Sequence, residues 1–309
     1  MLSISHFCLR TLKLQQSEDR DPITPASTEI TYLKVPASRG SIWLSRAYRL
    51  FVSSPGVWFG IAGFLMVMLM LPFINHLVAI LMPVLIGGLM LGCHKQSKTS
   101  PIKFEHLFEG LKSNTKELLL LSAFYAGLSV LISLATFYIM LMFGVNIEEL
   151  IANLVPKTQT VMTQEQALEW MQGLERDGIL MKLLLALLIF LALMIPLFMA
   201  FWFAPALVVL NKASAAQALK ISYLACKDNF VAFLIYGLVA FVYLIAFFVI
   251  ISILMILIQP IAIILIFVGY LAIFAITLIS IYTAYLDIFN PESNLSDDQL
   301  NESDSSMLA

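Results

Sequence analysis

Histidine, cysteine and serine are the residue types in this chain that could bind a metal ion or attack a substrate, and their spacing favours neither chemistry. The four histidines, His6, His76, His94 and His106, are far apart and lack carboxylates at ligand spacing, whereas a zinc site needs three or four ligands in one place. The serines of residues 41–53 have no GxSxG turn and no paired base. We therefore expect no metal ion, no cofactor and no enzymatic activity.

The cysteines and the charge balance argue against two further classes of site. Cys8, Cys93 and Cys226 show neither CxxC nor Cys/His spacing, so free thiols are expected rather than a disulfide or a metal site. With 18 Lys or Arg against 20 Asp or Glu, the formal net charge is −2, and the chain has no basic stripe suited to nucleic acid. We expect no nucleic-acid partner.

Composition indicates that the elements carrying these residues are membrane helices. The chain has 309 residues, of which 60 % are hydrophobic and 12 % are charged, and its mean hydropathy is +0.91. Soluble domains carry about 25 % charged residues. Because so few charged side chains cannot cover a soluble surface, the apolar excess must face lipid. The sequence predicts an all-α polytopic membrane protein.

The apolar stretches predict six crossings, since a helix needs roughly 20 residues to span the about 30 Å hydrocarbon core. The uncharged stretch between Asp228 and Asp287 is too long for one crossing and is expected to turn back at Gln259–Pro260. Pro196 and Pro205 are expected to kink the fourth span. The spans are predicted at about residues 57–72, 76–93, 118–144, 179–210, 230–258 and 261–286.

The positions of Lys and Arg predict the orientation. Fifteen of the 18 precede an odd-numbered span, and only Lys157, Arg176 and Lys182 fall on the other side. Because positive residues are retained in the cytoplasm, both termini are expected there. Residues 1–37 and the acidic residues 289–309 are predicted to be disordered tails flanking a membrane domain at 38–288. The loop at 145–178 either lies on the opposite membrane surface or covers the bundle.

A segment with helical periodicity precedes each odd-numbered span on the cytoplasmic side. In the first, Trp43, Ala47 and Leu50 are predicted to form the apolar side, with the arginines on the other side. The others lie at about residues 103–112 and 218–228. We therefore predict three hairpins, each preceded by an interfacial amphipathic helix that is either an elbow orienting the next span or a dedicated lipid or partner site. The candidate lipid-interface residues are Arg39, Trp43, Arg46, Arg49, Lys103, Lys112, Lys220 and Lys227.

Two pairs of glycines are candidates for close helix packing. Gly56 with Gly60, and Gly88 with Gly92, each have the GxxxG spacing that lets membrane helices approach one another. We expect them to pack the first hairpin, and the alternative is a homo-oligomer contact.

Several segments resemble a known family. VPASRGSIWLSRAYRLF, MPVLIGGLMLGC, FAPALVVL, SAAQALKISYLACKDN and YLDIF look like a family of uncharacterised proteobacterial inner-membrane proteins, distantly similar to the membrane domain attached to some glycerophosphodiester phosphodiesterases. The resemblance covers about residues 32–290 and implies a six-span inner-membrane protein of Gram-negative bacteria, with the loop at 145–178 in the periplasm. It carries over no activity, because the phosphodiesterase chemistry belongs to a separate soluble barrel whose metal-binding carboxylates are absent here.

The interior of the spans is poor in reactive groups. No Asp, Glu, Lys, Arg or His lies away from the span ends, whereas ion-coupled transporters usually keep an ionisable residue at depth. Hydroxyls within the spans are expected to bond their own helix or a neighbouring one. We expect a non-enzymatic protein that organises membrane lipid or a protein partner at the cytoplasmic leaflet. The alternative is a transporter or channel for a neutral or amphiphilic molecule.

Overall fold

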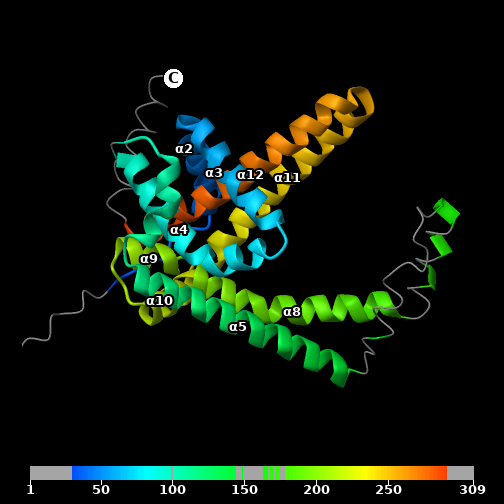
Figure 1. The fold of residues 1–309 in the computed structure, drawn as a ribbon, viewed down its shortest axis with the longest axis horizontal. Helices are drawn as coiled ribbons and strands as arrows, with labels where there is room; N and C mark the ends of the chain where they lie inside the picture. Colours follow the sequence, from blue (N-terminus) through cyan, green and yellow to red (C-terminus); the bar gives the residue numbers. More distant parts are fainter. Residues whose placement is uncertain are drawn as a thin grey trace, which may run out of the picture. The chain divides into compact units, whose positions relative to one another are not determined.

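The computed structural model describes residues 30–98, 100–143 and 178–290, with a few further positions between 148 and 173. All regular structure in these ranges is helical (Figure 1). Five of the described helices are long and apolar enough to cross a membrane, and a bent pair could make a sixth. The prediction of an all-α, multi-pass membrane protein is confirmed at this level. The tails at 1–29 and 291–309 and nearly all of the loop at 145–178 lie outside the described residues.

The first two helices meet at a sharp bend. Helix α2 (Arg39–Ser53) and helix α3 (Pro55–Met70) form an angle of 104°. Ser54 has φ −152° and ψ 56°, because a residue before proline is driven out of the helical region. The 16 residues of α3 rise only about 24 Å at 1.5 Å per residue, which is less than the hydrocarbon thickness.

Helix α4 (Ile74–Lys98) packs against α3 after a tight turn at Phe73, whose φ is +67°. It is followed by η1 (Phe104–Leu111), a 3₁₀ helix that packs on α4. The sequence predicts an amphipathic helix at about residues 103–112, and the structure has this 3₁₀ helix there. Leu107 is fully buried against α4 while Phe104 and Leu111 are exposed, so the expected apolar stripe does not bury one continuous face.

Helices α5 (Thr115–Met142) and α8 (Ile179–Trp202) run side by side (Figure 1). The predicted fourth span, at 179–210, is two helices, because the chain breaks at Phe203 and resumes as α9 (Ala204–Leu210) with Pro205 in its first turn. Pro196 lies inside the continuous α8. Of the two prolines, Pro205 therefore marks the break, since proline fits the first turn of a new helix.

The last part of the chain is α10 (Ala215–Asp228), α11 (Phe230–Leu257) and α12 (Gln259–Phe289). Ser214 caps α10, and the carboxylate of Glu117 from α5 accepts a 2.7 Å hydrogen bond from the Ala215 N–H. The predicted turn at Gln259–Pro260 is present, with Pro260 in the first turn of α12. Helices α11 and α12 then run side by side (Figure 1).

Burial is concentrated where the short helices meet the ends of the long ones. Nearly all of α9 and the last dozen residues of α12 are buried, together with Trp43 of α2 and Trp58 of α3. By contrast, few side chains of α8 and α11 are buried, and long rows of Leu, Ile, Val and Phe remain exposed on them. An exposed apolar surface of this extent is what lipid-facing helices require.

The two glycine pairs have different surroundings. A Cβ on Gly88 would overlap the carbonyls of His106 and Leu107, and one on Gly92 would come within 2.9 Å of the His106 Cβ. Gly56 and Gly60 have no close neighbour. The expectation that both pairs pack the first hairpin must be corrected, because only the second pair is tightly packed and its partner is η1 rather than α3.

Candidate functional site

A buried carboxylate joins the two ends of the described chain. Asp287 of α12 is 1 % exposed and accepts hydrogen bonds from three side chains of α2. Arg39 donates through Nε (2.9 Å) and Nη2 (3.0 Å), Trp43 through Nε1 (2.8 Å) and Arg46 through Nη1 (2.6 Å). Thr283, one turn earlier, donates to the Trp43 carbonyl at 2.9 Å. We call this set the Asp287 clamp.

The Asp287 clamp shows that the prediction of which residues share a face of α2 is wrong. Arg39, Trp43 and Arg46 are separated by four and three residues, and this spacing places them on one face of a helix. The sequence pattern predicts Trp43 on the opposite side of the helix from the arginines, at the lipid interface. Trp43 is instead fully buried and Arg46 is 7 % exposed. The indole N–H of Trp43 and the guanidinium group of Arg46 both donate hydrogen bonds to Asp287. A buried carboxylate needs such donors to offset its lost hydration.

The remaining candidate interface residues are on the surface. Arg49 on α2, Lys103 and Lys112 flanking η1, and Lys220 and Lys227 on α10 are all exposed. Lys103 lies 3.7 Å from the carboxylate of Glu105. The structure thus separates the eight predicted residues into a clamped set of three and an exposed set of five, on three helices.

Residues 32–36 form an extended strap that the sequence assigned to a disordered tail. The buried side chain of Asn229 accepts a hydrogen bond from Val35 N–H (2.8 Å) and donates one to the Leu33 carbonyl (2.9 Å). Leu33 N–H also donates to the Ile288 carbonyl (2.8 Å). Residues before α2 therefore also contact the helical part of the chain. Nothing in the hydropathy pattern signals these contacts, because they use backbone groups.

Titratable groups outside the long helices respond to burial and to close neighbours. The pKa of Tyr32 is raised, first because its hydroxyl donates a 2.7 Å hydrogen bond to Asp228. Burial raises the pKa of the Cys226 thiol to about 12. Burial lowers the pKa of His106, whose Nδ1 accepts a 3.0 Å hydrogen bond from Lys103 N–H. Tyr32 and His106 thus have carboxylates close by, Asp228 at 2.7 Å and Glu109 at 3.8 Å, and neither pair lines the groove described next.

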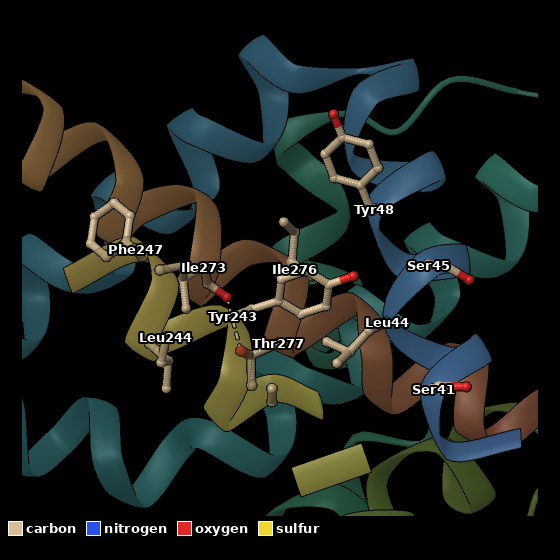
Figure 2. Close-up of a pocket in the computed structure, with 11 residues that line it drawn as sticks. Ser41, Leu44, Ser45, Tyr48, Tyr243, Leu244, Phe247, Ile273, Ile276 and Thr277 are labelled. Atoms are coloured by element: carbon tan, nitrogen blue, oxygen red, sulfur yellow. Dashed lines mark hydrogen bonds between the residues drawn. The ribbon is translucent and has the colours of Figure 1, made fainter. Parts of the chain in front are cut away.

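A cavity of about 490 Å³ lies between α2, α11 and α12. We call it the α2 groove. From α2 it is lined by Ser41, Leu44, Ser45 and Tyr48, from α11 by residues within 240–247, and from α12 by residues within 273–277. Figure 2 shows the α2 side chains along one side of the groove and Tyr243 extending from α11 towards α2. Its volume is in the range of small-molecule sites, about 300–1,000 Å³.

The clamp positions one wall of this groove. It holds Trp43 and its neighbours against α12, and Gly40 brings α2 so close to α11 that a Cβ there would overlap the Ala232 carbonyl. Ser41, Ser45 and Tyr48 lie on the opposite face of α2 from Arg39, Trp43 and Arg46, because these sets are about half a helical turn apart. No local sequence pattern indicates the groove, because its walls come from three helices that are far apart in the chain.

The described residues contain no group of three or more His, Cys, Asp or Glu that could hold a metal ion. Cys93 and Cys226 are buried free thiols, and Cys8 lies outside the described residues. A comparison of the chain with protein-family models, with curated proteins and with solved structures finds no match. The described residues therefore form an apolar groove with hydroxyl groups, next to helices that carry exposed cations.

Proposed function

We propose that this protein is a six-span inner-membrane protein that engages membrane lipid at the cytoplasmic leaflet without catalysing a reaction. The observation that carries the proposal is the α2 groove, a cavity with mainly apolar walls and a hydroxyl-bearing helix along one side. Such a combination suits an amphiphile, whose chain and head need different surroundings. The proposal agrees with the resemblance to proteobacterial inner-membrane proteins.

The proposed topology has three hairpins, α3–α4, α5–α8 with α9, and α11–α12, each preceded by a short helix at the cytoplasmic surface. The contacts within each pair and the order α2, η1 and α10 before them support it. The exposed Arg49, Lys112 and Lys220 on or beside these short helices would face anionic headgroups, each contributing about 1 kcal/mol near the surface.

The topology has a direct test, because α3 is short and the bend at Ser54 could make α2–α3 a re-entrant segment. Reporter fusions after residue 309 and before residue 1 should both report the cytoplasm. A cysteine replacing Phe73, which is 88 % exposed between α3 and α4, should be labelled by an impermeant maleimide from the periplasm. Ends on opposite sides, or an unlabelled position 73, would contradict six crossings.

Lipid engagement is tested by native mass spectrometry of the protein purified in mild detergent. We expect a stoichiometric phospholipid to remain bound. The variant Arg49→Gln/Lys112→Gln/Lys220→Gln should retain less phosphatidylglycerol than the wild type from mixed micelles, with retention of phosphatidylcholine unchanged. A wild-type protein that retains no phospholipid would overturn the proposal.

The alternative is a conduit for a neutral or amphiphilic molecule. Hydroxyls such as Ser133, Thr136 and Ser252 bond the carbonyl four residues earlier in their own helices, which favours lipid engagement over a polar path through the described helices. Flux of a neutral solute into proteoliposomes, absent from protein-free vesicles, would favour the conduit.

A further inference from the structure

The α2 groove carries a more specific inference, which rests on the proposed function. We infer that the groove holds one acyl chain of a membrane lipid whose head has no net charge and carries hydrogen-bond donors, as an ethanolamine phospholipid does. Three properties of the groove lead to this assignment: its walls, its charge and the state of its hydroxyls.

The apolar walls of the groove favour binding of a lipid acyl chain. Leu44 of α2, Leu244 and Phe247 of α11 and the isoleucines of α12 line the cavity, and each methylene of a chain that is buried against such walls adds to the binding. The exposed surfaces of α5 and α8 are also apolar, whereas the groove adds hydroxyl side chains from α2 and α12 beside its apolar walls. A chain in the groove therefore differs from chains that merely surround the protein.

The groove contains no charged side chain. All eleven residues that line it are uncharged. Arg39 and Arg46 of α2 are bound to Asp287 on the other face of the helix, and the exposed Arg49 follows the lining residue Tyr48 in sequence but does not itself line the groove. A head with a net negative charge would find no cation along the lining. Because an unpaired charge beside apolar walls is costly, the lining favours a head that is neutral overall.

The hydroxyls of the groove present acceptors. Ser41 donates its proton to the Ser38 carbonyl (2.8 Å), Ser45 to the Ile42 carbonyl (2.9 Å) and Thr277 to the Ile273 carbonyl (2.8 Å). Their protons are used within the helices, so their free lone pairs accept. Tyr48 and Tyr243, which are 57 % and 67 % exposed, add two phenol groups to the lining. A head that supplies N–H or O–H donors complements this lining.

The experiment uses the full-length protein in nanodiscs with phospholipids that carry a diazirine on one acyl chain, followed by peptide mapping. With the ethanolamine lipid we expect labelling of α11 and α12 at the groove-lining positions. Ala240→Phe fills the groove, and Ala246→Phe makes the same change on α11 outside the lining residues. The first variant should lower groove labelling by about tenfold, since several methylene contacts are lost, and the second should not.

The head is tested with a choline lipid of the same charge and chain. Loss of the N–H donors should reduce groove labelling roughly three- to tenfold, the effect of one or two hydrogen bonds, and Ser41→Ala/Ser45→Ala should abolish the difference between the two lipids. Equal labelling by both lipids in the wild type would overturn the assignment of the head.

The outcomes separate this inference from the proposed function. If the wild type retains phospholipid but labelling is spread evenly over the exposed faces of α5, α8 and α11, or if Ala240→Phe changes nothing, the groove assignment is overturned and lipid engagement stands. If the wild type retains no phospholipid, the proposed function itself is overturned. Stronger groove labelling by an anionic phosphatidylglycerol probe than by the ethanolamine lipid would contradict the charge argument alone.

Discussion

The indole nitrogen of Trp43 donates a 2.8 Å hydrogen bond to Asp287, 244 residues later in the chain. Both side chains are buried, and the bond fixes the helix before the first span to the end of the last one. The clamp built around it determines how α2 lies against α11 and α12, and therefore the shape of the α2 groove.

Replacing the clamp carboxylate should destabilise the protein strongly. Asp287→Asn keeps the shape of the side chain but removes the charge that both arginines contact. Breaking a buried ion pair by removing one partner costs about 3–5 kcal/mol, so the midpoint of thermal unfolding in detergent should fall markedly. The measurement is thermal unfolding followed by tryptophan fluorescence.

The matched control for the clamp is Glu109→Gln, which removes the pair between Lys95 and Glu109. Their side chains are 47 % and 24 % exposed, and exposed pairs contribute about 0–1 kcal/mol. The midpoint should change little. A loss for Asp287→Asn no larger than for this control would show that the clamp does not hold α2.

The two glycine pairs offer a second comparison. Gly88→Ala should be destabilising by about 1–3 kcal/mol, because overpacking forces the backbone to shift and the new methyl group would meet the carbonyls of η1. Gly56→Ala, the same change in open surroundings, should be neutral or slightly stabilising. Chemical denaturation of both variants checks this, and equal losses would contradict the packing of η1 on α4.

The strap should open when Asn229 is replaced. Asn229→Ala removes the side chain that bonds Leu33 and Val35, and two partly buried backbone groups lose this partner, at a cost of about 1 kcal/mol for each hydrogen bond. Cleavage by trypsin after the exposed Lys34 should accelerate roughly tenfold. Tyr32→Phe removes only the exposed hydrogen bond to Asp228 and should accelerate cleavage less. Similar rates of cleavage for the two variants would show that Asn229 does not hold the strap.

Stability should fall at mildly acidic pH because of His106. Burial lowers its pKa below the ordinary 6.5, so below pH 6.5 the unfolded chain takes up a proton that the folded chain resists. The contribution is fully present above pH 6.5 and is lost as the pH falls towards the lower folded pKa. His106→Gln should flatten the pH dependence of the unfolding midpoint just below pH 6.5, and an unchanged slope would rule out this histidine.

Much of the fold could be predicted from the sequence because lipid imposes a one-dimensional constraint. A crossing must be long and apolar, so the described helices lie within a few residues of the predicted spans, and Ser54, Pro55 and Pro205 mark real helix ends. The periodicity also indicated segments of helical structure at α2, η1 and α10. It could not assign the faces of α2, because arginine and tryptophan are equally plausible at a membrane surface and in a buried ion pair.

By itself the sequence determined that the chain is a helical membrane protein with its cations gathered before the odd-numbered spans, because hydropathy and charge act locally along the chain. Only the tertiary structure decided what those residues contact. Asp287 had looked like the end of an uncharged stretch, and Asn229 like a helix terminus. Their partners lie some 200 residues away, and such pairings depend on how the helices cross in space, which no local pattern encodes. The α2 groove exists for the same reason.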